Sequence, residues 1–168
     1  KDSKFGMVGT PVAHSVSPVA MGAARYYRAT GYGPALELAT GLARYFREHA
    51  KLIDEDGRWH GNHFHIVALG VLGQLEYAIA ANDQNMLRWV VRAYEYAKSI
   101  GDPTLGFFGG IPPCNPCSYN PNAEECGADK DRDYVEPCSV ADMVLIALQL
   151  TRAGAGDYYE DVEHYVRN

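Results

Sequence analysis

Residues 62–81, NHFHIVALGVLGQLEYAIAA, predict an amphipathic helix, because apolar residues recur three or four positions apart. Gly70 and Gly73 interrupt this pattern, and each costs about 1 kcal/mol relative to alanine inside a helix. Close approach of another helix or of a ligand at the two glycines would offset that cost. The apolar positions of the helix are Ile66, Leu69, Leu72, Leu75, Ala78 and Ile79.

Helical patterns continue on both sides of this stretch. Together they predict an all-α chain of three helical hairpins, at about residues 18–53, 62–101 and 138–168. No strand-like alternation of convincing length interrupts them. Stacked hairpins of this kind indicate a bundle, a solenoid or part of an α/α toroid.

The first hairpin has recognisable boundaries. Residues 1–14 have no sustained period and predict a loop, after which Ser17 and Pro18 predict a helix N-cap and first helical residue. A second helix begins near Pro34 and ends in the charged turn 54–57. Its expected apolar stripe is Leu38, Leu42, Tyr45, Phe46, His49 and Ile53.

Composition restricts the function classes. The chain has 168 residues, enough for one domain and one core, and a net charge of −6 with a pI near 5.4. This acidity argues against a nucleic-acid or anionic-membrane surface. The sequence has no uninterrupted run of about 18 apolar residues, so we expect no membrane span. The N-terminal residues have no signal-peptide h-region and the first residue is not Met, which suggests a processed or excised piece and leaves the localisation open.

A Cys/Pro-rich loop at about 102–137 separates the second and third hairpins. So long a polar insertion is usually functional or disordered. Cys114 and Cys117 form a CxxC pair that, with Cys126 and Cys138, could make a four-cysteine structural zinc site. A disulfide between Cys114 and Cys117 remains an alternative, since the spacing alone does not decide.

The end of this loop carries a second possible metal site. Pro137 is suited to the first position of a helix, which puts Cys138 in the first turn, where backbone N–H groups and the helix dipole stabilise a thiolate. Glu136 lies two residues before Cys138, and a thiolate with a carboxylate is a plausible half of a zinc site. The alternative is a buried cysteine beside a capping carboxylate.

Histidines and loop carboxylates are further candidates. His63 and His65 could bind a metal or hydrogen-bond a polyol, and we favour substrate contacts because no HExxH motif is present. Glu124 and Glu125 precede Glu136 by twelve and eleven positions. A pair of carboxylates could supply acid/base chemistry at a glycosidic bond, although solvated loop charges are the plainer interpretation of each.

The segment 134–141, YVEPCSVA, resembles the Glu-x-Cys signature of the zinc-dependent β-L-arabinofuranosidase-like glycoside hydrolases. His63-Phe-His65 followed by Ala81-Asn-Asp83, and the glycines at 109–110, are similar to further family motifs in the same order. The resemblance covers about residues 60–168, and Glu-x-Cys is its most specific part.

The resemblance implies an (α/α)6 barrel, a carbohydrate substrate and a bound zinc ion. Glu136 and Cys138 would be zinc ligands, His63 and His65 substrate-binding pocket residues, and Glu125 the catalytic acid/base. The two adjacent downstream cysteines of the family are absent, so the nucleophile is not in this chain. The barrel would then be completed by the remainder of a longer chain or by a second copy.

Two other interpretations remain. The chain could be a non-enzymatic helical-repeat module whose Cys-rich loop is a structural zinc clip. It could also be an α/α-toroid sugar isomerase or epimerase that uses His63 or His65 as a base.

Overall fold

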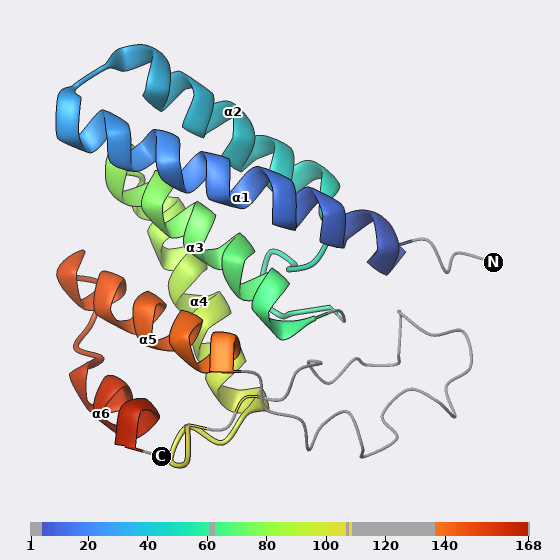
Figure 1. Cartoon of the computed structure of the whole chain (residues 1–168), viewed down its shortest axis with the longest axis vertical. Coiled ribbons are helices and arrows are strands. Elements are labelled where there is room, and N and C mark those ends of the chain that lie inside the picture. Colours follow the sequence, from blue (N-terminus) through green and yellow to red (C-terminus); the bar gives the residue numbers. More distant parts are fainter. Residues whose placement is uncertain (1–4, 61–62, 107, 109–136, 168) are drawn as a thin grey trace.

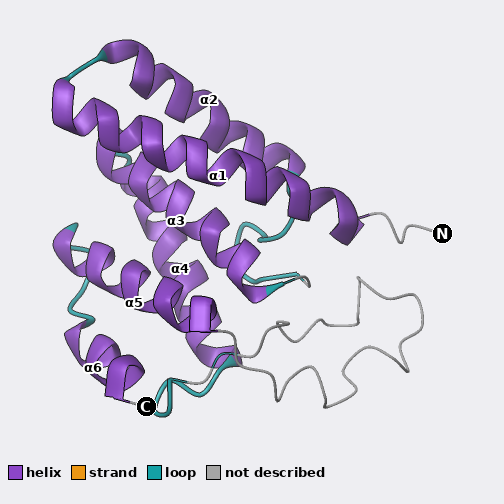
Figure 2. Cartoon of the chain, viewed as in Figure 1, coloured by secondary structure: helices purple, strands orange, loops and turns teal. Residues whose placement is uncertain are grey.

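The computed structural model describes residues 5–60, 63–106, 108 and 137–167. These residues form helices, with one isolated antiparallel bridge between Ile53 and Trp59 and no strand (Figure 2). The prediction of an all-α chain is therefore confirmed for the described part. The helices are α1 (Phe5–Thr30), α2 (Gly33–His49), α3 (Phe64–Ala81), α4 (Gln84–Ile100), α5 (Pro137–Arg152) and α6 (Tyr159–Arg167).

The helices form three consecutive hairpins. The first helices of the hairpins, α1, α3 and α5, lie side by side and run in roughly the same direction, while α2, α4 and α6 return (Figure 1). Helix α3 is central, because it contacts α1, α2, α4 and α5. This order brings the starts of α3 and α5 to the same end of the helix row.

Helix α1 differs from the sequence-based expectation. It begins at Phe5, so the predicted loop is wrong over residues 5–14, and residues 1–4 lie outside the described part of the chain. The predicted start at Ser17 and Pro18 is also wrong, because Pro11 and Pro18 lie inside the helix. A proline in a helix interior costs about 3 kcal/mol, and both prolines are exposed. Burial of the opposite face offsets this cost. That face consists of Ala13, Ser17, Ala20 and Ala24.

Helix α2 buries a different face from the one its large apolar residues suggest. Leu38 and Tyr45 are about half exposed, at 50% and 46%, and the helix ends at His49 rather than Ile53. Small side chains let α2 approach its neighbours closely, which leaves larger ones outside. The buried residues of α2 are Ala35, Ala39, Ala43 and Phe46.

The two glycines of α3 allow other elements to approach it, as predicted. A Cβ added at Gly73 would come within 3.1 Å of Ser17 Cβ on α1, and one at Gly70 within 2.4 Å of the Phe46 ring on α2. The first distance is tighter than ordinary van der Waals contact. The conformational cost of glycine is therefore offset by close packing against α1 and α2.

A buried carboxylate joins the three parallel helices. Glu76 of α3 is 0% exposed, and its Oε1 lies 2.7 Å from Nη2 of Arg25. Its Oε2 accepts a hydrogen bond from Nη1 of Arg28 at 3.0 Å, and Gln149 Nε2 of α5 donates to Oε1 at 3.3 Å. Both carboxylate oxygens of Glu76 thus accept hydrogen bonds from protein donors, as a buried charge requires.

Helix α3 also bears on the membrane prediction. Among the described helices it is long and apolar enough to cross a membrane by length and composition, with 18 residues and a mean hydropathy of 1.5. Gln74 and Glu76 lie within this window, so it is not the uninterrupted apolar run that the sequence analysis considered, and the absence of a membrane span stays a prediction. Of the segment, 67% is buried inside the protein, as in a core helix.

Hydrogen bonds of two tyrosines, Tyr94 and Tyr165, connect α6 to α4. The hydroxyl of Tyr94 donates to Asp161 Oδ2 at 2.8 Å and lies 3.2 Å from the hydroxyl of Tyr165. Lys98 Nζ forms an ion pair with the same Asp161 oxygen at 2.8 Å. Burial raises the pKa of Tyr94 and of Tyr165 above the usual value, so both phenols stay neutral.

Candidate functional site

The two predicted histidines lie at the start of α3. His63 is the N-cap residue, with extended backbone at φ −68° and ψ 123°, and His65 is the second residue of the helix. Both side chains are half-buried, and their ring centroids are 6.2 Å apart at an interplanar angle of 77°. The structure therefore brings both imidazoles together at one helix end.

The start of α5 carries the described part of the Glu-x-Cys segment. Pro137 is the first helical residue, as predicted, and the half-buried Cys138 follows it in the first turn. Asp142 lies four positions after Cys138, so both residues belong to the same side of the helix. Ser139 and Asp142 are buried.

A hydrogen bond connects the two helix starts. His65 Nδ1 lies 2.6 Å from Asp142 Oδ2. The short distance is that of a charge-assisted bond between an imidazole N–H and a carboxylate. With Nδ1 engaged, the ring is oriented and Nε2 is the nitrogen that can exchange a proton or contact a ligand.

Burial governs the electrostatics of Asp142. Its side chain is 11% exposed, and this burial raises the pKa of the carboxyl above its usual value. The hydrogen bond and the charge of His65 partly offset that rise. A buried carboxyl with a raised pKa beside a polar partner is frequent at functional sites.

Sequence reasoning missed Asp142. The available signal was a carboxylate between Ala141 and Met143, one turn after Cys138, on a helix that is otherwise mostly apolar. Such a residue needs a partner when buried. Identifying His65 as that partner required the packing of α3 against α5.

Several predicted residues lie outside the described part of the chain. These are Glu125 and its rival Glu124, Glu136, and the three loop cysteines Cys114, Cys117 and Cys126. Their assigned roles stay predictions. Among the described residues, no group of three or more His, Cys, Asp or Glu side chains is arranged to hold a metal ion. Cys138 is the described residue of the predicted zinc pair.

Comparison of the chain with models of known protein families, with curated proteins and with solved structures found no match. The resemblance to the glycoside hydrolase family therefore stays an expectation from the sequence motifs.

Proposed function

We propose that the chain is part of a carbohydrate-active enzyme, a β-L-arabinofuranosidase-like glycoside hydrolase with an (α/α)6 barrel and a zinc ion. The hairpin order supports this proposal. Parallel α1, α3 and α5 with returning α2, α4 and α6 form the sequence of neighbours that three successive hairpins of a toroid would have (Figure 1).

The hydrogen bond between His65 and Asp142 is the observation that carries the proposal. It joins the His-x-His segment to the helix that begins at Pro137, although 77 positions separate the two residues. The helix starts that carry His65 and Cys138 therefore lie at the same end of the helix row, which supports the proposal. An oriented imidazole there is suited to hydrogen-bond a sugar hydroxyl.

The proposed roles follow the donor chemistry of the residues. Cys138 and Glu136 would hold zinc, since a thiolate and a carboxylate are both zinc ligands. Zinc would keep the thiolate deprotonated when bound. Glu125 would donate a proton to the leaving oxygen, and His63 and His65 would bind the sugar. The nucleophile would lie in another part of the complete enzyme.

Zinc stoichiometry separates this proposal from the helical-repeat alternative. Metal analysis of freshly purified protein should give one zinc per chain, lost in Cys138→Ser and retained in Cys114→Ser and Cys117→Ser. A structural four-cysteine clip would instead lose its zinc in all three variants. Protein without zinc, with Cys138 readily alkylated, would contradict the glycosidase proposal.

Sugar binding tests the proposed pocket without requiring a complete active site. Addition of L-arabinose should shift the ring proton signals of His63 and His65 in a magnetic resonance spectrum. The exposed His14 of α1 serves as an internal control. Replacement of Asp142 by Asn should weaken the response, because the neutral amide forms a weaker hydrogen bond to the His65 imidazole than the carboxylate does. Unchanged His63 and His65 signals at saturating sugar would contradict the proposal.

A sugar isomerase or epimerase is the second candidate, favoured by the same hydrogen bond. A carboxylate on Nδ1 orients an imidazole so that Nε2 can act as a general base. Incubation of sugars in deuterated water distinguishes the two reactions. A base mechanism exchanges a carbon-bound proton with solvent, whereas glycoside hydrolysis does not.

The proposed barrel requires more helices than the three described hairpins. Apolar side chains at both ends of the row support completion by a second copy or by further chain. Leu38 and Tyr45 of α2 are about half exposed at one end, and Tyr159 and Val166 of α6 are 59% and 68% exposed at the other. A solution mass measurement by light scattering would show whether copies of this chain associate.

A further inference from the structure

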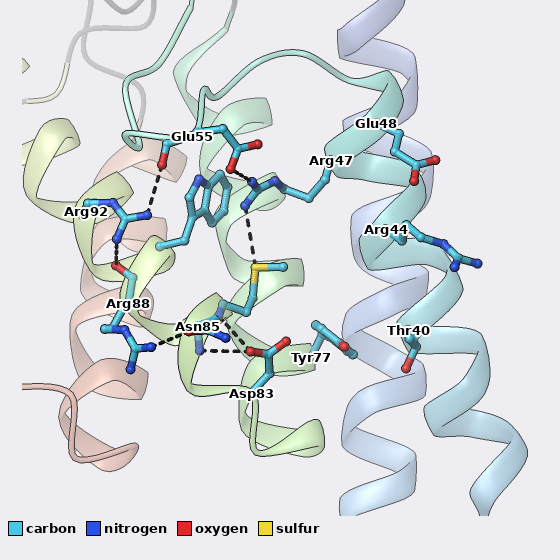
Figure 3. A pocket seen from close by; sticks show the side chains of 12 residues that line it. Thr40, Arg44, Arg47, Glu48, Glu55, Tyr77, Asp83, Asn85, Arg88 and Arg92 are labelled. Atoms are coloured by element: carbon cyan, nitrogen blue, oxygen red, sulfur yellow. Dashed lines mark hydrogen bonds and ion pairs between the residues drawn. The ribbon is translucent and has the colours of Figure 1, made fainter.

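A groove with a volume of about 590 Å³ lies between α2 and α4 (Figure 3). The turn after α2 and the end of α3 complete its wall. None of its residues belongs to the candidate site at the starts of α3 and α5. The lining residues are Thr40, Arg44, Arg47, Glu48, Glu55, Tyr77, Asp83, Asn85, Met86, Arg88, Trp89 and Arg92.

The groove is locally cationic on an acidic chain. Four arginines line it against three carboxylates, whereas the whole chain has a net charge of −6. One of those carboxylates is already engaged, because Asp83 Oδ1 accepts the backbone N–H groups of Asn85 and Met86 at 3.0 Å. Asp83 thus caps α4, which leaves fewer acceptors for the arginines.

The side chain of Arg47 is held in place inside the groove. It is only 19% exposed, and its guanidinium lies 4.2 Å from the ring centroid of Trp89. Its Nη2 pairs with Glu55 Oε2 at 2.5 Å. The indole is itself fixed, since Trp89 Nε1 donates to the backbone carbonyl of Asp54 at 2.8 Å. A stacked and paired guanidinium of this kind loses little further freedom when it binds a ligand.

Neutral acceptors orient two more arginines. Arg92 Nη2 donates to the backbone carbonyl of Glu55 at 3.0 Å, and Arg88 Nη2 donates to Asn85 Oδ1 (Figure 3). Neither bond neutralises a guanidinium. Among the described residues, Arg44, Arg88 and Arg92 form no ion pair. Their charge is therefore available to a ligand.

Glu55 marks the point where two guanidinium groups converge. Arg47 binds its carboxylate, and Arg92 binds its backbone carbonyl. The carboxylate is 89% exposed, so solvent competes for it and the pair with Arg47 is weak. The exposed carboxylate of Glu55 thus contacts the half-buried guanidinium of Arg47 at the position that an oxyanion of a ligand would take.

We infer that this groove binds a small molecule of sugar size that carries a carboxylate or phosphate group. The oxyanion displaces Glu55 from Arg47 and accepts hydrogen bonds from Arg47 and Arg92. Planar guanidinium groups suit both anions, because two parallel N–H donors match two oxygens. The volume lies in the range of small-molecule pockets. This inference does not depend on the proposed function of the other site.

Calorimetric titration with inorganic phosphate, D-galacturonate and neutral D-galactose tests the site. We expect at least one of the two anions to bind, and added salt to weaken it. Arg92→Gln should lower the affinity about tenfold, the usual effect of losing a charge-assisted hydrogen bond. Arg152→Gln, an exposed change on α5, should have no effect.

Glu55→Gln provides a change in the opposite direction. Removal of the competing carboxylate should tighten anion binding about two- to fivefold, the range for an exposed ion pair. Tighter binding of phosphate assigns the groove to phosphate esters, and tighter binding of galacturonate assigns it to acidic sugars. Failure of both anions to bind at millimolar concentration, equal binding of galactose, or unchanged affinity in Arg92→Gln would overturn the inference.

Discussion

His65 Nδ1 and Asp142 Oδ2 lie 2.6 Å apart, so one hydrogen bond joins the starts of α3 and α5. The pair has both a functional and a structural consequence. It orients the imidazole at the candidate site, and it compensates a buried carboxylate that would otherwise destabilise the packing of the two helices.

Replacement of His65 by Ala should destabilise the protein, because Asp142 then remains buried without this partner. We expect a loss of about 1–3 kcal/mol in the free energy of unfolding at neutral pH, measured by urea denaturation. The double variant His65→Ala/Asp142→Asn should recover part of the loss, since it removes the unpaired charge. No recovery in the double variant would argue against compensation by His65.

The pH dependence of the His65→Ala variant has a defined sign. The pKa of Asp142 is already raised by burial, and loss of the His65 bond and charge should raise it further. The folded state then binds this proton more tightly than the unfolded chain. The contribution of this proton to the free energy of unfolding is complete at a pH below the pKa of the unfolded chain. It is lost as the pH rises through the pKa of the folded state. His65→Ala should therefore be less harmful at acid pH than at neutral pH, as measured by unfolding at a series of pH values.

Gly73→Ala should also destabilise the fold. A new Cβ would lie within 3.1 Å of Ser17 Cβ and 3.2 Å of the Ser17 backbone, so α1 would have to shift by a few tenths of an ångström to accept it. We expect a cost of about 1–3 kcal/mol, typical of overpacking. Gly22→Ala is the matched control within α1, because a Cβ there meets nothing within 4 Å. That change should stabilise by about 0.5–1 kcal/mol. Equal effects of the two changes would contradict this packing.

Glu76→Gln should weaken the connection between α1, α3 and α5. The amide keeps the shape but loses the charge that pairs with Arg25 and Arg28. Because both arginines are nearly half exposed and can turn to solvent, we expect a loss of about 1–3 kcal/mol rather than the full cost of breaking a buried pair. Glu163→Gln, in an exposed pair with Arg167, should change stability by less than about 0.5 kcal/mol. Chemical denaturation of both variants measures the difference.

Tyr94, Tyr158 and Tyr165 should ionise above the usual pH of a tyrosine in an alkaline absorbance titration. Burial raises the pKa of all three phenols above the usual value. The folded state therefore holds these protons more tightly than the unfolded chain. The contribution of these protons to the free energy of unfolding is complete below a pH of about 10, the pKa of tyrosine in the unfolded chain, and it falls as the pH rises above that value. Ionisation of these three phenols should coincide with unfolding. Their ionisation at the usual tyrosine pKa, while circular dichroism still shows intact helices, would contradict their burial.

Local patterns predicted much of the architecture. Apolar periodicity located α3, Pro137 marked the start of α5, and the glycines of α3 indicated a close approach by another element. These features depend on neighbours in sequence, which propensity and spacing describe. The same patterns failed at α1 and α2, where Pro18 and the large apolar residue Leu38 suggested the wrong boundary and the wrong face.

The sequence by itself determined the all-α class, the hairpin order and the clustering of His63, His65 and Cys138 near helix starts. Only the tertiary structure decided that α1 continues through two prolines, that alanines form the contact face of α2, and that Asp142 binds His65. It also brought Arg47 and Arg92 together at Glu55. The physical reason is common to these cases. Burial and ion pairing depend on which helices meet, and that information lies in contacts between residues far apart in the chain.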